Sequence, residues 1–373
     1  MTTLSNNKTN EHITIFATIL KFGVGISHMR VLQPMAFLVK MRGVDVYVSD
    51  DANIVPDRSD LGSWEIGPRV IILHRPILAG PEGLARLRAL LARGFVIISE
   101  YDDHPEDISS APTVLSEYEG RPPYLPSVSS IRPEDLLTFT GVHAVQTSTE
   151  ALARVLRPRN PEVAVFPNAI DQAPRVRNFA NPDRLTLFFG SLNRDQDWRE
   201  VMPALNAVLK AAGDRLFVRV IADKEFFDAL LTPYKHFIPF CNYEYYLDFL
   251  SQSDIALMPR RDTPVNRCKS DAKFLEASAA RVLSLASPVV YGDSIDHGRT
   301  GLIFRTPQDF TSHLCAILGN PNAARSMANA ARSHVLATHM LNSQIQPRLD
   351  WYRELWQRRD VLTAALRARV PGL

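Results

Sequence analysis

The sequence predicts an α/β protein with two Rossmann-like domains, each built on a parallel sheet. First, short apolar runs alternate with amphipathic segments from residue 13 onward, which is typical of successive βαβ units. Second, this alternation stops in a polar, proline-bearing segment, residues 172–184, which reads as an interdomain linker, and it resumes at Leu185. Third, 373 residues suffice for about two domains with a core each. We expect an N-terminal domain over residues 1–178, a second domain over 179–343, and a helix over 344–373 that packs back toward the N-terminal domain.

Apolar runs in the first half read as buried strands of one sheet. They cover residues 13–20, 45–50, 70–78, 95–103, 144–148 and 164–171. Helices are expected between them over residues 31–43, 81–94 and 149–156, and Gly43 and Gly94 stand where a C-cap glycine belongs. Residues 107–133 contain five prolines and no strong periodicity, so they are expected to form a long loop.

The second half repeats the pattern between Leu185 and Phe304. Strands are expected over residues 185–192, 216–223, 236–241 and 255–258. Helices are expected over residues 198–212 and 243–253, and a further helix begins at Ser270, which reads as its N-cap. Two helical stretches rich in Ala, Leu and Arg, residues 323–340 and 344–369, would then close the structure.

Composition excludes several classes of protein. The net charge is +2, from 42 basic and 40 acidic residues, which lacks the basic excess of a general nucleic-acid binder. The three cysteines are few, odd in number and widely spaced, which argues against a disulfide framework or a zinc knuckle and favours reduced cytosol. The first residues are polar, and no run of about 18 apolar residues occurs. We expect a cytoplasmic protein, with peripheral association at the inner face of the membrane as an open alternative.

The richest stretch for chemistry runs over residues 253–304, where five cations precede one helical glutamate. Arg260 and Arg261 follow a predicted strand at its carboxyl end, where open parallel sheets bind their ligands. Lys269 and Lys273 lie at or before the first turn of the helix that begins at Ser270, where cations are unfavourable unless an anion is near. Lys273 and Glu276 share one helical face. The stretch therefore predicts a nucleotide-sugar site, with a solvated basic loop as the alternative.

The order of several segments resembles the GT-B glycosyltransferases, especially the bacterial family 1/family 4-type enzymes that build surface polysaccharides from nucleotide sugars. These segments are VHAVQTSTEALARVL followed by VAVFPNAID, then FFGSLNRDQDW, YLDFLSQSDIALMPR and KSDAKFLEASAARVLSLASPVVYGDSIDHGRTGLIF. The resemblance covers nearly the whole chain. It implies two Rossmann-like domains facing each other across a cleft, C-terminal helices that close the structure, and transfer of a sugar from a nucleotide diphosphate sugar to a hydroxyl of a glycan or a lipid-linked glycan.

The resemblance also implies a donor site in the second domain. The glycine turn after its first strand would approach the diphosphate, which falls on Gly190, Ser191 and Arg194; the backbone near Cys241, Asn242 and Tyr243 would meet the base. Glu276 matches the second glutamate of the family's pair and would bind the ribose. The first glutamate is replaced by Cys268, so the stereochemical outcome is not carried over.

The cations that would hold the leaving diphosphate differ from the family's usual pattern. The lysine that commonly follows the glycine turn is absent, and Lys269, Lys273 or Arg261 would replace it. We expect these cations, Arg194 and the helix start at Ser270 to stabilise the leaving group, without a metal ion or a cofactor.

Residues of the first domain would complete the cleft. Gly23 and Gly25 would let the backbone pass near the donor, with a flexible turn as the alternative, and Arg30 would reach into the cleft, with an exposed helix arginine as the alternative. The sequence EYDDHPED places Glu100, Asp102, Asp103 and His104 at a strand's carboxyl end, and Asp103 or His104 is the candidate for activating the acceptor hydroxyl. A capped turn is the alternative.

Four wider interpretations stay open. The long loop over residues 107–133 could lie on the acceptor side, and Arg358, Arg359, Arg367 and Arg369 could face anionic lipid. The same fold could also serve a nucleotide-sugar epimerase or a phosphorylase. Because the first glutamate is missing, a non-catalytic partner subunit is the remaining alternative.

Overall fold

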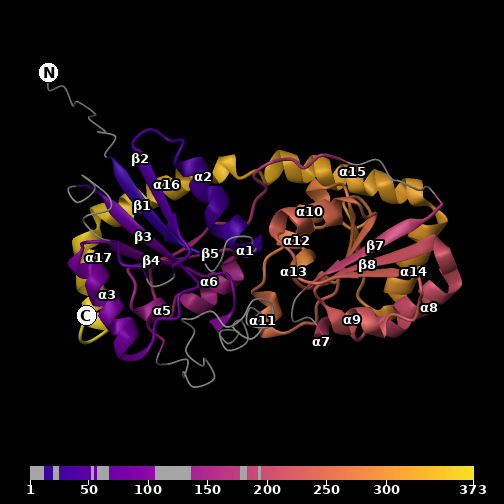
Figure 1. The fold of residues 1–373 in the computed structure, drawn as a ribbon, viewed down its shortest axis with the longest axis horizontal. Helices are drawn as coiled ribbons and strands as arrows, with labels where there is room; N and C mark the ends of the chain where they lie inside the picture. The colour runs from indigo at the N-terminus through magenta and orange to yellow at the C-terminus, as the bar shows by residue number, and fades with distance from the viewer. Residues whose placement is uncertain are drawn as a thin grey trace.

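The computed structural model describes residues 12–19, 25–51, 54–56, 67–105, 136–176, 183–191 and 195–373. These residues form two six-stranded sheets in which all strand pairs are parallel (Figure 1). The predicted fold class, two Rossmann-like domains, is confirmed. Arg194, Gly23 and the loop predicted over residues 107–133 lie outside the described residues.

The first sheet has the strand order β2-β1-β3-β4-β5-β6. Its strands are β1 (Ile13–Thr18), β2 (Val44–Ser49), β3 (Arg69–His74), β4 (Val96–Glu100), β5 (Ala144–Thr147) and β6 (Val163–Val165). Helices cover both faces, so the central strands β3 and β4 are apolar runs without alternation. One face packs against α2 (Gln33–Leu38) and α16 (Asn342–Gln357), and the other against α3 (Gly80–Ala92), α5 (Leu137–Thr140) and α6 (Glu150–Leu156).

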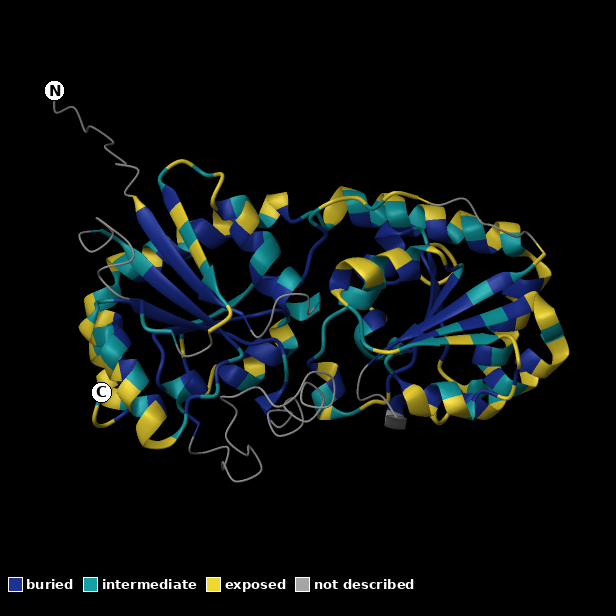
Figure 2. Ribbon diagram, viewed as in Figure 1, coloured by how far each residue is buried: buried dark blue, intermediate teal, exposed yellow. Residues whose placement is uncertain are grey.

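The second sheet has the order β12-β11-β10-β7-β8-β9. Its strands are β7 (Leu185–Gly190), β8 (Leu216–Ile221), β9 (Lys235–Ile238), β10 (Ile255–Met258), β11 (Leu283–Ala286) and β12 (Leu302–Ile303). One face packs against α8 (Met202–Ala212), α9 (Lys224–Ala229) and α14 (Pro307–Gly319), and the other against α10 (Tyr243–Ser251) and α12 (Ala272–Ala279). Figure 2 shows buried strands inside and exposed helix faces outside. The remaining helical elements are α1 (Gly25–Ser27), η1 (His28–Leu32), α7 (Asp195–Trp198), η7 (Gly213–Arg215), α11 (Pro264–Arg267), α13 (Pro288–Tyr291), α15 (Pro321–Thr338) and α17 (Arg359–Arg369).

The C-terminal helices run from the second domain back to the first (Figure 1). After α15, the chain pairs with the backbone at Ile170, which accepts a hydrogen bond from the amide of Leu341 and donates one to the carbonyl of His339. The next helix, α16, buries Leu349 and Tyr352 in the core of the first domain. Within the described ranges, no helix combines the length and the apolar character that crossing a bilayer would require.

Two predicted helices differ from the observed ones. The helix expected over residues 344–369 is two helices, α16 and α17, because Arg358 leaves helical geometry at φ −92° and ψ 7°. The helix expected over residues 31–43 ends at Leu38, and a π-helical turn, η1, precedes it. Pro34 follows this turn, and proline has no amide hydrogen with which to continue an α-helical ladder backwards.

Candidate functional site

A polar pocket lies at the carboxyl ends of β7 and β10, the edge where open parallel sheets bind their ligands. The described residues that line it include Gly190, Ser191, Met258, Arg260, Lys273 and Tyr291. The approach to Gly190 is close, since a Cβ there would lie 2.5 Å from Cζ of Phe188 and 3.2 Å from Cε2 of Tyr246. The glycine turn and one of the predicted cations, Lys273, therefore meet in one place, together with Arg260.

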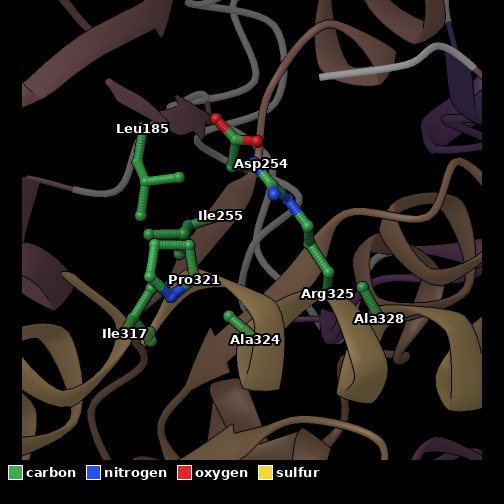
Figure 3. A pocket seen from close by; sticks show the side chains of 8 residues that line it. All are labelled: Leu185, Asp254, Ile255, Ile317, Pro321, Ala324, Arg325 and Ala328. Carbon is green, nitrogen blue, oxygen red and sulfur yellow. The ribbon is translucent and has the colours of Figure 1, made fainter. Parts of the chain in front are cut away.

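A second hollow, shown in Figure 3, lies at the opposite edge of the same sheet, where the strands begin. It is lined by Leu185, Asp254, Ile255, Ile317, Pro321, Ala324, Arg325 and Ala328, at the amino ends of β7 and β10. Burial raises the pKa of Asp254 to about 6, but its carboxylate already accepts a hydrogen bond from the amide of Thr186 (2.7 Å). This hollow is mainly apolar and lies at the wrong end of the strands for ligand binding, so we assign the site to the carboxyl edge.

Lys273 is a partly buried cation, and no described carboxylate contacts it directly. It lies in the first turn of α12, and its Nζ donates a hydrogen bond to the carbonyl oxygen of Gly190 and lies 5.5 Å from the centre of the Tyr246 ring. The pKa of Lys273 is lowered to about 8, mainly by burial and also by nearby Arg260, while Glu276 opposes the shift. No described carboxylate forms an ion pair with Lys273. A bound anion would relieve this unfavourable arrangement.

Arg260 is the second cation of the pocket. It is buried, and among the described residues its guanidinium donates hydrogen bonds to two neutral oxygens, the hydroxyl of Tyr291 (3.4 Å) and the side-chain carbonyl of Asn266 (3.3 Å). Arg261, which the sequence suggested for this role, is about half exposed, and its Nε lies 3.9 Å from Asp197. Both arginines follow β10, and their order in the sequence does not reveal which one faces the pocket.

Glu276 lies on the same helix as Lys273 and is buried. Its two carboxylate oxygens accept hydrogen bonds from the hydroxyls of Tyr243 (2.9 Å) and Tyr246 (3.0 Å). Burial raises the pKa of Glu276, and Lys273 and the two tyrosines counteract that rise. Since a carboxylate can accept about four hydrogen bonds, about two lone pairs stay available for hydroxyls of a ligand.

Helix α10 supplies the two tyrosines, and sequence analysis identified their role incompletely. Tyr243 was expected to meet the base through its backbone, but its side chain also holds Glu276, and Tyr246 was not identified. Asn242 caps the helix, since its Oδ1 accepts a hydrogen bond from the amide of Tyr245 (2.9 Å). Gly25 of the first domain faces Tyr243, because a Cβ at Gly25 would lie 2.9 Å from Cδ2 of that ring.

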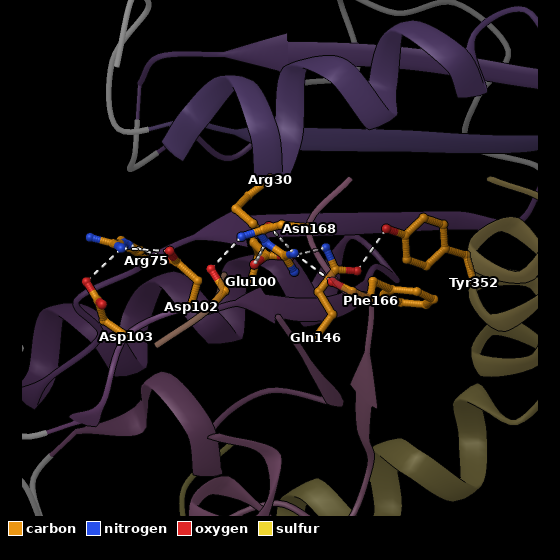
Figure 4. A network of polar contacts seen from close by, with 10 residues as sticks. Arg30, Arg75, Glu100, Asp102, Asp103, Gln146, Phe166, Asn168 and Tyr352 are labelled. Carbon is orange, nitrogen blue, oxygen red and sulfur yellow. Dashed lines mark hydrogen bonds and ion pairs between the residues drawn. The ribbon is translucent and has the colours of Figure 1, made fainter. Parts of the chain in front are cut away.

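Arg30 does not reach into the cleft, which corrects the sequence-based expectation. It is buried in the first domain (Figure 4), where Nε and Nη2 bind the carboxylate of Glu100 at 2.8 and 3.2 Å. Its Nη1 binds the carbonyl of Phe166 (2.6 Å) and the side chain of Asn168 (2.9 Å). The buried carboxylate of Glu100 needs a cation, and Arg30 supplies it.

The carboxylates that follow β4 are also engaged. Asp102 holds Arg75 through two hydrogen bonds of 2.6 and 2.9 Å, and Asp103 forms ion pairs with Arg75 (2.7 Å) and Lys269. Burial alone would raise the pKa of Asp103, but Arg75 and Lys269 outweigh it and lower that pKa to about 2. A carboxylate held so firmly in its charged form is a weak proton acceptor. His104, the other candidate, is buried beside it.

His74, at the carboxyl end of β3, was missed by sequence analysis. It is buried, and neither ring nitrogen has a hydrogen-bond partner within the described part of the chain. Burial lowers the pKa of His74 to about 3, so the ring is neutral at physiological pH. The only sequence signal was a histidine at the end of an apolar run.

Ser270 is not the N-cap of α12. The helix begins at Ala272, Asp271 occupies the N-cap position, and the hydroxyl of Ser270 accepts a hydrogen bond from Nδ2 of Asn168 in the first domain (2.7 Å). Across the described parts of the chain, no three His, Cys, Asp or Glu side chains gather as a metal site would require. Metal independence stays a prediction.

Comparison with known proteins agrees with this geometry. Residues 199–350 match the family described as "Glycosyl transferase-like". No curated protein matches the chain. Among solved structures, WaaG, a glycosyltransferase involved in lipopolysaccharide biosynthesis, is 15% identical with a TM-score of 0.59, over 91% of this chain and 99% of WaaG. HepE from Anabaena, solved with UDP and glucose, is 11% identical with a TM-score of 0.58, over 92% and 100% of the two chains.

TarM is a further match, at 10% identity and a TM-score of 0.54. The match covers 76% of this chain and 54% of TarM, so the chain spans about half of that protein's length. At these identities the solved structures establish the fold alone. The predicted resemblance is thereby confirmed: the chain has the GT-B fold, and residues 199–350 match the model of the glycosyl transferase-like family.

Proposed function

We propose that this protein is a glycosyltransferase that moves a sugar from a nucleotide diphosphate sugar to a hydroxyl of a glycan or lipid-linked glycan. One observation carries the proposal: Lys273, which is partly buried, and Arg260, which is buried, line one pocket, and neither has a described carboxylate as an ion-pair partner. Two like charges out of water are unfavourable unless an anion joins them. A diphosphate carries the charge that would satisfy both.

The pocket suits the charge that develops during glycosyl transfer. As the bond between the sugar and the leaving oxygen breaks, negative charge grows on the diphosphate and the sugar carbon becomes oxocarbenium-like. Lys273, Arg260 and the amino end of α12 would stabilise that charge from fixed positions. Glu276, held by two tyrosines, would accept hydrogen bonds from the ribose hydroxyls.

The acceptor would bind at the carboxyl edge of the first sheet. His104 is the candidate for activating the acceptor hydroxyl, because Asp103 is already committed to two cations. One structural relative, WaaG, is involved in lipopolysaccharide biosynthesis, which favours a role in cell-surface polysaccharide synthesis. A cytoplasmic location is part of this proposal. The proposed lipid contact of the C-terminal arginines is weakened, because Arg358 pairs with Glu162 and Arg369 binds the carbonyls of Thr140 and Val142.

Diphosphate binding is expected to weaken as the pH rises through about 8. Below its lowered pKa of about 8, Lys273 is protonated and attracts the anion, and above it this charge is lost. The dissociation constant, measured by calorimetry from about pH 7 to about pH 9.5, should therefore rise several-fold, with a tenfold change per unit as the limit. In Lys273→Arg the rise should vanish, because arginine keeps its charge. An unchanged rise in that variant would mean that another group titrates.

The first experiment is a thermal-shift panel with UDP, GDP, CDP, ADP and TDP, with and without magnesium. A ligand that binds only the folded state raises the apparent Tm. At a hundredfold excess over its Kd, it raises the free energy of unfolding by about 2.7 kcal/mol. We expect one diphosphate to give a selective shift that does not need magnesium and that Lys273→Met abolishes. If no nucleotide stabilises the protein, the proposed donor site is wrong.

A further inference from the structure

Three consecutive residues of the second domain, Cys268–Ser270, contact the first domain, and we call this segment the strap. The carbonyl of Cys268 accepts a hydrogen bond from Oγ1 of Thr149 (2.9 Å). Lys269 forms an ion pair with Asp103, and Ser270 accepts a hydrogen bond from Asn168. Cys268 itself is buried in the apolar core of the first domain. Backbone, charge and packing thus all join the strap to the opposite domain.

The partners of the strap lie at one edge of the first sheet. Asp103 follows β4, Thr149 follows β5 and Asn168 follows β6, and parallel strands bring these ends together. Figure 1 shows α11 and α12, which flank the strap, on the side of the second domain that faces the first. The strap therefore lies on the carboxyl edge of the first sheet.

Asp103 is itself held firmly in place. Arg75, which pairs with Asp103, also forms an ion pair with Asp102 and is largely buried (Figure 4). The backbone of Arg75 has φ 46°, a left-handed conformation that is unfavourable for a non-glycine residue and persists only where its surroundings enforce it. Its amide donates a hydrogen bond to the carbonyl of Glu100 (2.8 Å). The ion pair therefore fixes Lys269 against a rigid anchor.

The strap also lies directly beside the diphosphate pocket. Asn266, two residues before it, accepts the hydrogen bond from Arg260, and Lys273 follows it in the first turn of α12. Any movement of the strap would displace Asn266, which contacts Arg260, and the first turn of α12, which carries Lys273. Both members of the ion pair are mostly buried, with side-chain exposures of 16% for Lys269 and 19% for Asp103.

We propose that Asp103 is a positioning residue. It holds Lys269 in place and, through the strap, also the start of α12. A carboxylate of the first domain thereby sets the affinity of the second domain for a nucleoside diphosphate. This inference rests on the proposed function for its ligand. It replaces the role of acceptor base that the sequence suggested for Asp103. The two roles differ in a measurable way: a base acts on turnover, whereas the positioning residue acts on diphosphate binding without any acceptor.

The test uses the full chain and the variants Asp103→Asn, Lys269→Met and their combination. Without ligand, small-angle X-ray scattering should show a larger radius of gyration for each variant, because the domains lose their charged link. Calorimetry without acceptor, with the diphosphate from the panel that stabilises the wild-type protein most, should show about tenfold weaker binding. The losses of affinity in the two single variants should add to more than the loss in the double variant, since both single changes remove the same ion pair between Asp103 and Lys269.

Two controls separate positioning from general damage. Asp103→Glu keeps the charge and should restore most of the affinity. Glu162→Gln breaks a comparable ion pair of the first domain, with Arg358, and should leave scattering and binding unchanged. The proposal is overturned if Asp103→Asn keeps the wild-type radius of gyration, or if it binds diphosphate as well as or better than the wild type. If no diphosphate binds the wild-type protein, the proposed function fails, and the scattering measurement alone decides whether the strap joins the domains.

Discussion

Replacing Lys273 by methionine is expected to lower kcat/KM by about 10²–10³-fold while the protein stays folded. Methionine nearly preserves the length of the side chain and removes the charge that faces the leaving diphosphate. The folded state holds the pKa of Lys273 at about 8, below the 10.5 of a free lysine, so its charge destabilises the fold at neutral pH. The variant should therefore unfold at the same or a higher temperature. Steady-state kinetics with the identified donor and thermal unfolding measure the two effects.

Loss of activity with retained stability is the signature of a functional residue. Lys210→Met, on the exposed side of α8, is the control and should behave as wild type in both measurements. If Lys273→Met turns over at a near-normal rate, Lys273 does not stabilise the leaving group. If instead the variant unfolds at a much lower temperature, Lys273 stabilises the fold, contrary to what its lowered pKa predicts.

The substitution Arg30→Met should destabilise the first domain by about 3–5 kcal/mol, because it leaves the carboxylate of Glu100 buried without its cation. Arg30 and Glu100 are almost fully buried, and no water can replace the lost ion pair. Gln146 donates a hydrogen bond to the same carboxylate (2.7 Å) and Tyr352 of α16 donates one to Gln146 (2.8 Å), so the damage should spread to the docking of α16 (Figure 4). Urea denaturation, followed by tryptophan fluorescence and circular dichroism, measures the loss.

An exposed ion pair provides the matched comparison. Arg299→Met breaks the surface pair with Asp296 and should shift the unfolding midpoint little, because solvent screens such pairs. The double variant Arg30→Met/Glu100→Met should recover part of the stability lost in Arg30→Met, since the carboxylate that lacks its cation is then removed. A loss in Arg30→Met as small as that in Arg299→Met would contradict the assigned role of the buried pair.

Much of the fold could be predicted from the sequence because it depends on local patterns. Strands such as β3 and β10 are buried on both faces, so they stand out as apolar runs bounded by polar residues. The candidate diphosphate pocket was also predictable in outline, since Gly190 ends one strand and Lys273 lies in the first turn of a helix. Such positions follow from the order of elements along the chain, because parallel strands place their carboxyl ends at one edge.

Interactions between distant residues were not predictable in this way. The sequence expected Arg30 in the cleft, Arg261 in the pocket and Ser270 as an N-cap, and the structure places all three elsewhere. After β10, it is Arg260 and not Arg261 that lines the described pocket. Arg30 instead pairs with a buried carboxylate, that of Glu100, seventy residues away in the sequence.

By itself, then, the sequence determined the two α/β domains and the edge of the second sheet at which the cations gather. Periodicity and strand ends are local properties of the sequence. A strand that is buried on both faces needs a continuous apolar run, and such runs can be recognised in the sequence. Only the tertiary structure decided which cations stay free for a ligand and which are neutralised within the protein. Lys269 and Asp103 are 166 residues apart and on different domains, and their attraction exists only because the folded chain brings them together out of water.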